Sequence, residues 1–398
     1  MEDYYPSNRF YHTPKDTIET VDLTFTLRSV KLAVGTLAEL AGIHTHGSKI
    51  QSDDFAKVDL RSNDIDWERD AHKERLFTLM PGSSRIDIID LTFSHVHSKK
   101  SLFLEEIPAG RYAAPHYRSV CLCPKPDDTL VFVAMIRMVP RASDTEAGIV
   151  KIFDSLNFEE KQSFEVGKYP RHGCFGTDGQ RFYLPYWGEA FFEVFDSISL
   201  RRISKIATPK PIAKLQVNDS EELAVGVSPE TNSLLIFDLK THSHVCFSGK
   251  ISVPKDVVLL DERHALVCSQ DESKIYQVDL VEKKITAIIA DDFPSMRLIV
   301  SPDKKKIVAV HHMNSSISVF NIEQRANVRK LTKIKRLDLQ EKIEDAVFGI
   351  DSDHLYLLSA SRCRLFGLNL LTDQVFWAMR TGGVRPSAGF TQILYLHR

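Results

Sequence analysis

The stretch LLIFDLK at residues 234–240 is one copy of a short phrase that returns along most of the chain. Each copy is a largely apolar run that ends on an acid or an amide, and these anchors are Asp90, Asp154, Asp196, Asp238, Asp279, Asn321 and Asn369. Most successive anchors lie about 42 residues apart, whereas the first and last intervals are longer. A repeat of this length indicates a fold assembled from similar blades.

The residues around this phrase, 212–249, fit four apolar strands separated by polar turns: IAKLQV, LAVGVSP, LLIFDL and HVCFSG. The turns NDSEE, ETNS and KTHS carry the residues that favour tight reversals. A solenoid is the structural rival, but its repeats usually contain helices or shorter strand units. We therefore predict an all-β fold, a seven-bladed β-propeller over residues 63–398. Its blades are expected to start near Asn63, Tyr117, Tyr169, Lys210, Ser252, Phe293 and Lys342.

Both ends of the chain carry additional strand patterns. Residues 1–62 form a predicted N-terminal extension, in which residues 20–28 alternate like a strand and residues 30–43 fit a short helix or a strand. The terminal stretch GFTQILYLHR is a clear last strand. We expect one end of the chain to complete a sheet begun by the other, because closure removes exposed sheet edges. An eighth, composite blade is the alternative.

The composition is that of an ordinary globular protein, with 43% hydrophobic and 26% charged residues and a net charge of -2. No global field favours nucleic acid or a membrane surface. The chain has no run of about 18 apolar residues and no basic, then apolar, leader at its start. We therefore expect a cytoplasmic protein without a membrane or nucleic-acid partner. Its six cysteines are expected to be reduced, and Cys121 and Cys123 share one face of a strand, a poor geometry for a disulfide.

Several blades also place a proline a few residues ahead of the first strand, as in VGKYPRHGCFGTDGQRFYLPYW and DDFPSMRLIVSPDKKKIVAVHHMNSSISVFN. Together with the repeated phrase, this pattern resembles the YVTN-type bacterial β-propellers, which are related in shape to WD-repeat proteins. The resemblance covers residues 63–382, although the YVTN tetrad and the Trp-Asp and Gly-His pairs are absent. It implies the fold, but such families include lactonases, dehydrogenase subunits and interaction scaffolds.

A cation recurs where the chain enters the first strand of a blade. These residues are Arg118, Arg171, Lys214, Lys255 and Arg297, with Lys342 near the seventh blade. If they surround the channel mouth, they form a positive funnel for a carboxylate, a phosphate or an acidic peptide. The alternative is that each cation pairs with a neighbouring acid, for example Lys255 with Asp256 or Lys342 with Glu344 and Asp345.

Loops predicted for the same face carry a second group of candidates: His172, Tyr186, Trp187, Glu189, His311, His312 and Asn314. A Trp and a Tyr beside a His and a carboxylate can form a pocket for a sugar or a peptide. Within this set, Glu189 and His172 are candidates for an acid and a base. The alternative is that the loop aromatics bind a partner or pack on the rim.

The remaining motifs argue for no cofactor. Three His-x-His pairs, at residues 44 and 46, 95 and 97, and 242 and 244, lack the third ligand that a metal site needs. Residues 304–306 and 325–336 of the sixth blade are rich in Lys and Arg, which fits either a docking patch or a solvated edge. Phosphate-binding loops, nucleophile elbows and zinc-protease motifs are all missing.

These observations favour a non-enzymatic interaction scaffold or accessory subunit. Its channel face is expected to bind an acidic or anionic partner, most simply a protein, through Arg118, Arg171, His172, Trp187, Glu189, Lys255, Arg297, His311 and His312. The alternative is a propeller enzyme of the lactonase, hydrolase or isomerase type, with a small anionic substrate in the central channel.

Overall fold

The computed structural model describes residues 74–79, 85–92, 95–104, 116–138, 147–311, 313–325, 328–359, 361–381 and 392–397. The chain divides into compact units of residues 1–65 and 66–398, and all the described residues belong to the second. The predicted extension at residues 1–62 and the blade start near Asn63 lie outside them. Within the described part, the short 3-10 helix η3 (Pro229–Thr231) interrupts the strands, and no helix there is long and apolar enough to cross a membrane.

The described strands form seven four-stranded antiparallel sheets, which confirms the predicted seven-bladed propeller. Each sheet is one blade, with its strands in order from the channel outward. Blade 1 contains β28 (Gln392–His397), β1 (Glu74–Leu79), β2 (Arg85–Thr92) and β3 (His95–Phe103). Blade 2 contains β4 (His116–Pro124), β5 (Leu130–Met138), β6 (Gly148–Asp154) and β7 (Glu160–Val166). Blade 3 contains β8 (Cys174–Phe175), β9 (Arg181–Pro185), β10 (Phe191–Asp196) and β11 (Arg202–Ala207).

The other four blades follow the same order. Blade 4 contains β12 (Lys214–Val217), β13 (Leu223–Ser228), β14 (Ser233–Asp238) and β15 (His244–Ser248). Blade 5 contains β16 (Pro254–Leu259), β17 (His264–Ser269), β18 (Lys274–Asp279) and β19 (Lys284–Ala290). Blade 6 contains β20 (Ser295–Val300), β21 (Lys306–His311), β22 (Ser316–Arg325) and β23 (Val328–Asp338). Blade 7 contains β24 (Asp345–Phe348), β25 (His354–Ser359), β26 (Arg364–Asn369) and β27 (Gln374–Arg380).

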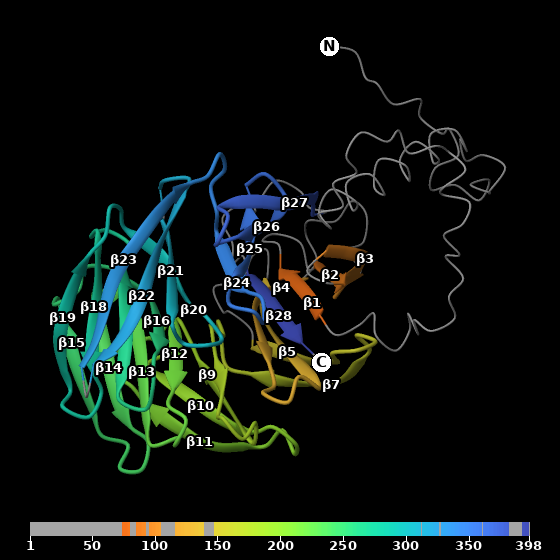
Figure 1. Cartoon of the computed structure of the whole chain (residues 1–398). Helices are drawn as coiled ribbons and strands as arrows, with labels where there is room; N and C mark the ends of the chain where they lie inside the picture. The colour runs from red at the N-terminus through yellow and green to blue at the C-terminus, as the bar shows by residue number, and fades with distance from the viewer. Residues whose placement is uncertain are drawn as a thin grey trace, which may run out of the picture. The chain divides into compact units, whose positions relative to one another are not determined.

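The C-terminal strand closes the circle of blades. Strand β28 pairs with β1 in an antiparallel register from Glu74 opposite His397 to Leu79 opposite Gln392 (Figure 1). The first strand of each blade also contacts the first strand of the next, through β24, β28 and β4 back to β8. The prediction that one end of the chain completes a sheet begun by the other is confirmed for this strand. The alternative of an eighth blade is wrong within the described residues, because the strand that would begin it belongs to blade 1.

The acid or amide that ends each repeated phrase has a local structural role. In five blades its side-chain oxygen accepts hydrogen bonds from the N–H groups two and three residues later; these anchors are Asp154, Asp196, Asp238, Asp279 and Asn369. The residue four positions after each anchor has a positive φ. The anchor is thus an Asx turn that reverses the chain between the third and fourth strands. Blade 6 departs from this pattern, because β22 and β23 continue pairing past Asn321 in a longer hairpin.

The apolar part of the phrase is buried on both faces of the sheet. In β14, Leu234 and Ile236 pack into the cluster shared with blade 5, whereas Leu235 and Phe237 pack into the cluster shared with blade 3. Alternate residues of a strand point to opposite faces, so a continuous apolar run supplies both neighbours. The apolar run of the phrase therefore supplies the side chains that pack one blade against both of its neighbours.

The second and third strands of blade 2 are separated by a long stretch of sequence. Strand β5 ends at Met138 and β6 begins at Gly148, and the residues between positions 138 and 147 lie outside the described part. Gly148 itself is tightly enclosed, because a Cβ atom built there would lie 2.8 Å from Cδ of Pro170. The start of β6 is therefore packed against the segment that leads into blade 3.

Closure of the ring depends in part on one amide side chain, which generates a test. The Gln392 Oε1 accepts a hydrogen bond from the Leu122 N–H at 2.7 Å, and its Nε2 donates to the Leu122 carbonyl at 2.8 Å. We expect Gln392→Ala to lower the free energy of unfolding by about 1–3 kcal/mol, because it removes both bonds between blades 1 and 2. Urea unfolding measures the change, with Gln374→Ala at the exposed start of β27 as control. Equal stability of the two variants would contradict this role.

Candidate functional site

Four charged side chains on the innermost strands link blades 4 to 7. Lys214 of β12 forms an ion pair with Asp256 of β16, and Arg297 of β20 approaches the other oxygen of Asp256 at 3.8 Å. The Arg297 guanidinium also donates two hydrogen bonds to Asp345 of β24, at 2.8 and 3.2 Å. Asp345 in turn accepts the N–H of Ile393 in β28 at 2.9 Å. We call Lys214, Asp256, Arg297 and Asp345 the inner ion-pair chain.

Polar contacts of other kinds close the remaining junctions between innermost segments. They are the two bonds from Gln392 to Leu122, the bond from the Cys123 thiol to the Gly173 carbonyl at 3.3 Å, and the bond from the Leu215 N–H to the His172 carbonyl at 3.2 Å. All seven junctions between blades are therefore bridged near the channel. Among these contacts of the described residues, those from blade 4 to blade 7 use paired charges.

The inner ion-pair chain is electrically matched. Burial opposes the ionisation of Asp256, but the charges of Lys214 and Arg297 outweigh it and hold the pKa of this carboxyl below its ordinary value. Burial likewise disfavours the guanidinium charge of Arg297, yet Asp345 and Asp256 raise its pKa above the ordinary value. These groups therefore stay charged at neutral pH, and each charge depends on its neighbours.

This arrangement changes the interpretation of the predicted cation funnel. Lys214 and Arg297 are engaged with carboxylates, and the suggested partner of Lys255, Asp256, is instead bonded to them. Among the residues that the structure describes, Lys255 makes no ion pair and its side chain is exposed. Burial of its ammonium by surrounding atoms and the like charges of Arg297 and Arg171 lower the pKa of Lys255. The charges of Arg297 and Arg171 thus reach Lys255, where Asp256 and Cys268 act against them.

Arg171 stacks on Trp187 at the entrance to blade 3. Its Cζ lies 3.7 Å from the centroid of the Trp187 ring, a cation–π contact. Main-chain bonds hold the two segments together, from the Arg171 N–H to Pro185 and from the Trp187 N–H to Tyr169, both at 2.9 Å. Burial lowers the pKa of the Arg171 guanidinium to about 9. The structure therefore brings Arg171 and Trp187 together as a rigid pair whose charge acts on Lys255.

A cavity of about 290 Å³ lies among the innermost segments of blades 1 to 4 and of blade 6. Its polar lining comes from His172, Lys214, Gln216, Arg297 and Gln392, and its sulfur atoms come from three cysteines. The volume approaches that of small-molecule pockets, and its charged lining is cationic. It is the part of the channel where a small molecule would fit.

The candidate acid and base do not share a cavity. His172 lines the channel cavity, whereas Glu189 lines a groove of about 540 Å³ between blades 2 and 3, together with Phe164, Phe191 and Glu193. Tyr186 is fully buried and donates a hydrogen bond to Glu193 at 2.6 Å, so it is part of the wall between these blades. The structure therefore gives no support to joint acid–base work by His172 and Glu189.

His311 is a structural residue of blade 6, and its expected position on a loop is wrong. It ends β21, is fully buried, and lies 2.6 Å through Nδ1 from the Ser316 hydroxyl and 3.2 Å through Nε2 from Asp291. Ser318 donates to Asp291 at 2.6 Å, and Lys333 pairs with it at 3.0 Å. This network occupies the polar atoms of His311. His312 lies outside the described residues, as does the side chain of Arg118.

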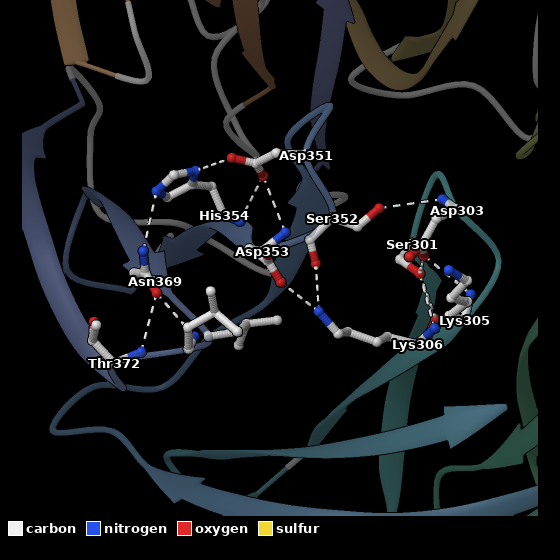
Figure 2. A network of polar contacts seen from close by, with 12 residues as sticks. Ser301, Asp303, Lys305, Lys306, Asp351, Ser352, Asp353, His354, Asn369 and Thr372 are labelled. Atoms are coloured by element: carbon white, nitrogen blue, oxygen red, sulfur yellow. Dashed lines mark hydrogen bonds and ion pairs between the residues drawn. The ribbon is translucent and has the colours of Figure 1, made fainter.

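Four basic residues of blade 6 pair with acids. Lys306 bonds to Asp353 at 2.5 Å and to the Ser352 carbonyl at 3.2 Å, while the Asp303 N–H donates to the Ser352 hydroxyl (Figure 2). Acids also pair with three cations of the long hairpin, namely Lys333, Lys335 and Arg336. These contacts fit a paired, solvated edge better than a docking patch.

Metal-ligating side chains do not gather in the part of the chain that the structure describes. No group of three or more His, Cys, Asp or Glu residues there is placed to hold a metal ion. The histidines at positions 44 and 46 lie outside the described residues, and His242 and His244 sit in a turn and at the start of β15.

The sequence interpretation missed the thiols of the cavity. Cys121 and Cys123 alternate along β4, and both line the cavity with Cys174. The available signal was their two-residue spacing, which places both side chains on one face of a strand. Only the assembly of blades shows that this face meets His172 and a cavity rather than a filled core.

The comparisons with known proteins establish the fold alone. The β-propeller domain of Cps50 (Swd1) from Myceliophteria thermophila is 11% identical with a TM-score of 0.57, over 67% of this chain and 88% of that one. A functionally unknown protein from Desulfotomaculum acetoxidans is 12% identical with a TM-score of 0.61, over 81% and 99%. Hydrazine synthase from Kuenenia stuttgartiensis is 13% identical with a TM-score of 0.54, over 73% and 99%. No family model and no curated protein matches the chain.

The inner ion-pair chain predicts a large effect of one substitution. Asp256→Ala leaves Lys214 and Arg297 without their shared carboxylate, and we expect a loss of about 3–5 kcal/mol in the free energy of unfolding. The control is Glu222→Ala, which breaks the exposed pair with Lys240 and should cost at most about 1 kcal/mol. Urea denaturation of both variants measures the difference. Similar losses would contradict the dependence of the ring on Asp256.

The His311 network predicts a pH effect. Burial opposes ionisation of Asp291, but hydrogen bonds from His311, Ser318 and Lys333 outweigh it and lower the pKa of Asp291 to about 2. Since the unfolded value is about 3.9, this stabilisation is complete above about pH 5 and is lost as the pH falls through about 2. We expect the free energy of unfolding of Asp291→Asn to fall less steeply over this range than that of the wild type. Parallel curves would show that Asp291 has an ordinary pKa.

Proposed function

We propose that this propeller is a non-enzymatic interaction protein that binds an acidic segment of a partner at the channel face. The observation that carries the proposal is the cluster of Lys255, Arg171 and Trp187. Lys255 is exposed and lacks an ion pair among the described residues, while Arg171 is held against Trp187 at 3.7 Å. Burial is the main cause of the lowered pKa of Lys255, and the charges of Arg297 and Arg171 add to it, so a carboxylate arriving at this cluster would stabilise the ammonium charge.

The surrounding chemistry supports a peptide rather than a free ion at this position. Trp187 is half-buried, so it offers an apolar surface beside the charges, as the anchors of protein interfaces do. The small hollow next to it is lined by Pro211, Ile212, Ala213 and Pro229 and ends at Glu230. An acidic segment that also carries an apolar residue would match both features. The proline ahead of the first strand, at Pro170 and Pro294, supports a YVTN-type interpretation of the repeat.

The alternative is a small-molecule site of an enzyme, and one observation favours it. The channel cavity of about 290 Å³ contains His172 beside Lys214 and Arg297, a setting suited to a compact anion. Against turnover of the lactonase, hydrolase or isomerase type, the intended acid Glu189 lines another groove and His311 is fully bonded within blade 6. The fold does not choose between these functions, since propellers serve both.

Charge reversal at Lys255 tests the proposal. We expect Lys255→Glu to weaken binding of a fluorescein-labelled polyglutamate peptide by at least about tenfold, or about 1.4 kcal/mol, because it replaces attraction by repulsion. Fluorescence anisotropy at low and physiological salt measures the dissociation constant, which should rise with salt. Arg297 is unsuitable for reversal, because its charge belongs to the inner ion-pair chain.

The matched control is Lys284→Glu, the same change on the outermost strand of the same blade. It should leave binding within about twofold of the wild type, since rim charges contribute little. An equal loss of affinity in both variants would show that only the net charge of the protein matters, and it would overturn the assignment of the site. Citrate is then added as a competitor at matched ionic strength. If citrate displaces the peptide equally well from the wild type and from Lys255→Glu, the result would favour the channel cavity and the small-molecule alternative.

A further inference from the structure

The channel cavity brings together sulfur chemistry that neither the fold nor the proposed function requires. The Sγ atoms of Cys121 and Cys123 lie 3.1 Å apart, and both thiols are almost fully buried from bulk solvent yet line the cavity. His172 faces the same cavity and acts on Cys121 through its charge and a hydrogen bond. Two sulfur atoms in contact beside an imidazole and an open volume are the components of a thiol–disulfide site.

The two thiols are electronically different. The hydrogen bond from Cys123 lowers the pKa of the Cys121 thiol well below its ordinary value. Burial opposes this shift, and His172 adds to it. The same bond and burial raise the pKa of Cys123, and burial raises that of Cys174 to about 12. A pair in which one sulfur loses its proton more readily than the other has a defined order of reaction.

We propose that Cys121 and Cys123 form a reversible disulfide site that reacts with small disulfides entering the channel cavity. The Cys121 thiolate attacks one sulfur of the disulfide RSSR, which forms a Cys121–S–S–R bond and releases RS⁻. The Cys123 sulfur then attacks Sγ of Cys121 and displaces the second RS group, which leaves with the Cys123 proton as RSH. Two protein thiols become one disulfide, and RSSR is reduced by two electrons.

The geometry of the strand makes this disulfide easy to reduce again. Two residues of a β-strand separate Cα atoms by roughly 6.4–6.8 Å, at the upper limit of the spacing that disulfides span. A disulfide there is strained, and strained disulfides have more oxidising potentials. The irregular register just before Cys121 provides some freedom for adjustment. The cavity of about 290 Å³ admits a small disulfide to these thiols.

Oxidation would also act on the closure of the ring. Leu122 lies between the two cysteines, and both its N–H and its carbonyl are bonded to Gln392 of β28. Drawing the flanking Cα atoms together changes the strand at the residue that joins blades 1 and 2. This consequence depends only on β4 and β28, so it stands apart from the partner proposed for Lys255.

The test uses the full chain and 3,3′-dithiodipropionate. After exposure, the protein is quenched in acid, unfolded, alkylated and digested with trypsin, and the masses are measured. We expect the fragment of residues 119–137, which holds both thiols, to become lighter by two hydrogen atoms and to resist alkylation until it is reduced. Cys246 and Cys363, which are partly exposed, serve as internal controls and should remain alkylated.

Two serine variants test the order of reaction. Cys123→Ser should accumulate a mixed disulfide at Cys121, because the resolving sulfur is missing, whereas Cys121→Ser should form at least about tenfold less mixed disulfide at Cys123. The proposal is overturned if both thiols stay alkylatable at reagent levels that oxidise Cys246. It is equally overturned if Cys121 pairs with Cys174, which would appear as a crosslink between fragments 119–137 and 172–181 and disappear in Cys174→Ser.

Discussion

The ion pairs of Arg297 are central to the inner ion-pair chain, on which the closed ring depends. The Arg297 guanidinium meets Asp345 of blade 7 with two hydrogen bonds and approaches Asp256 of blade 5, so a single side chain spans three blades. A buried charge is tolerated only when it is paired and hydrogen-bonded. Each member of the inner ion-pair chain therefore keeps its neighbours in place. The alternating order of charges also makes it costly to place one blade beside the wrong neighbour.

This structural use of charge determines which residues remain for binding. Lys214 and Arg297 are committed to carboxylates, and His311 is committed to Asp291 and two serines, although all three read as site residues in the sequence. Lys255, Arg171 and Trp187 remain as the group whose electrostatics favour an incoming anion. The candidate site is thus the group of cations and aromatic residues that lies outside the inner ion-pair chain. The proposed function rests on this cluster rather than on any catalytic arrangement.

The sulfur-lined side of the channel contrasts with the charged side. From blade 4 to blade 7 the innermost junctions use ion pairs, whereas blades 2 and 3 are joined there by the weak hydrogen bond of a thiol. The innermost strand of blade 3, β8, has only two residues, and the cavity of about 290 Å³ lies at this junction. The two-residue strand and the weak thiol hydrogen bond leave a cavity at this junction, whereas ion pairs occupy the junctions from blade 4 to blade 7. The channel is therefore lined by paired charges on the side of blades 4 to 7 and by thiols on the side of blades 2 and 3.

The sequence alone determined the architecture, because its period reflects local requirements. The anchor at the end of each phrase, such as Asp238, forms a turn. The apolar residues before it, such as Phe237, are buried on the two faces of the sheet. Blade number and strand order could therefore be predicted from these residues. The role of each cation could not, because Lys214, Lys255 and Arg297 look alike in sequence and differ only in the neighbours that closure brings to them. Asp256 pairs with Lys214 and Arg297 rather than with the adjacent Lys255. Coulomb interactions act through space between blades about 42 residues apart, and only the tertiary structure specifies those distances.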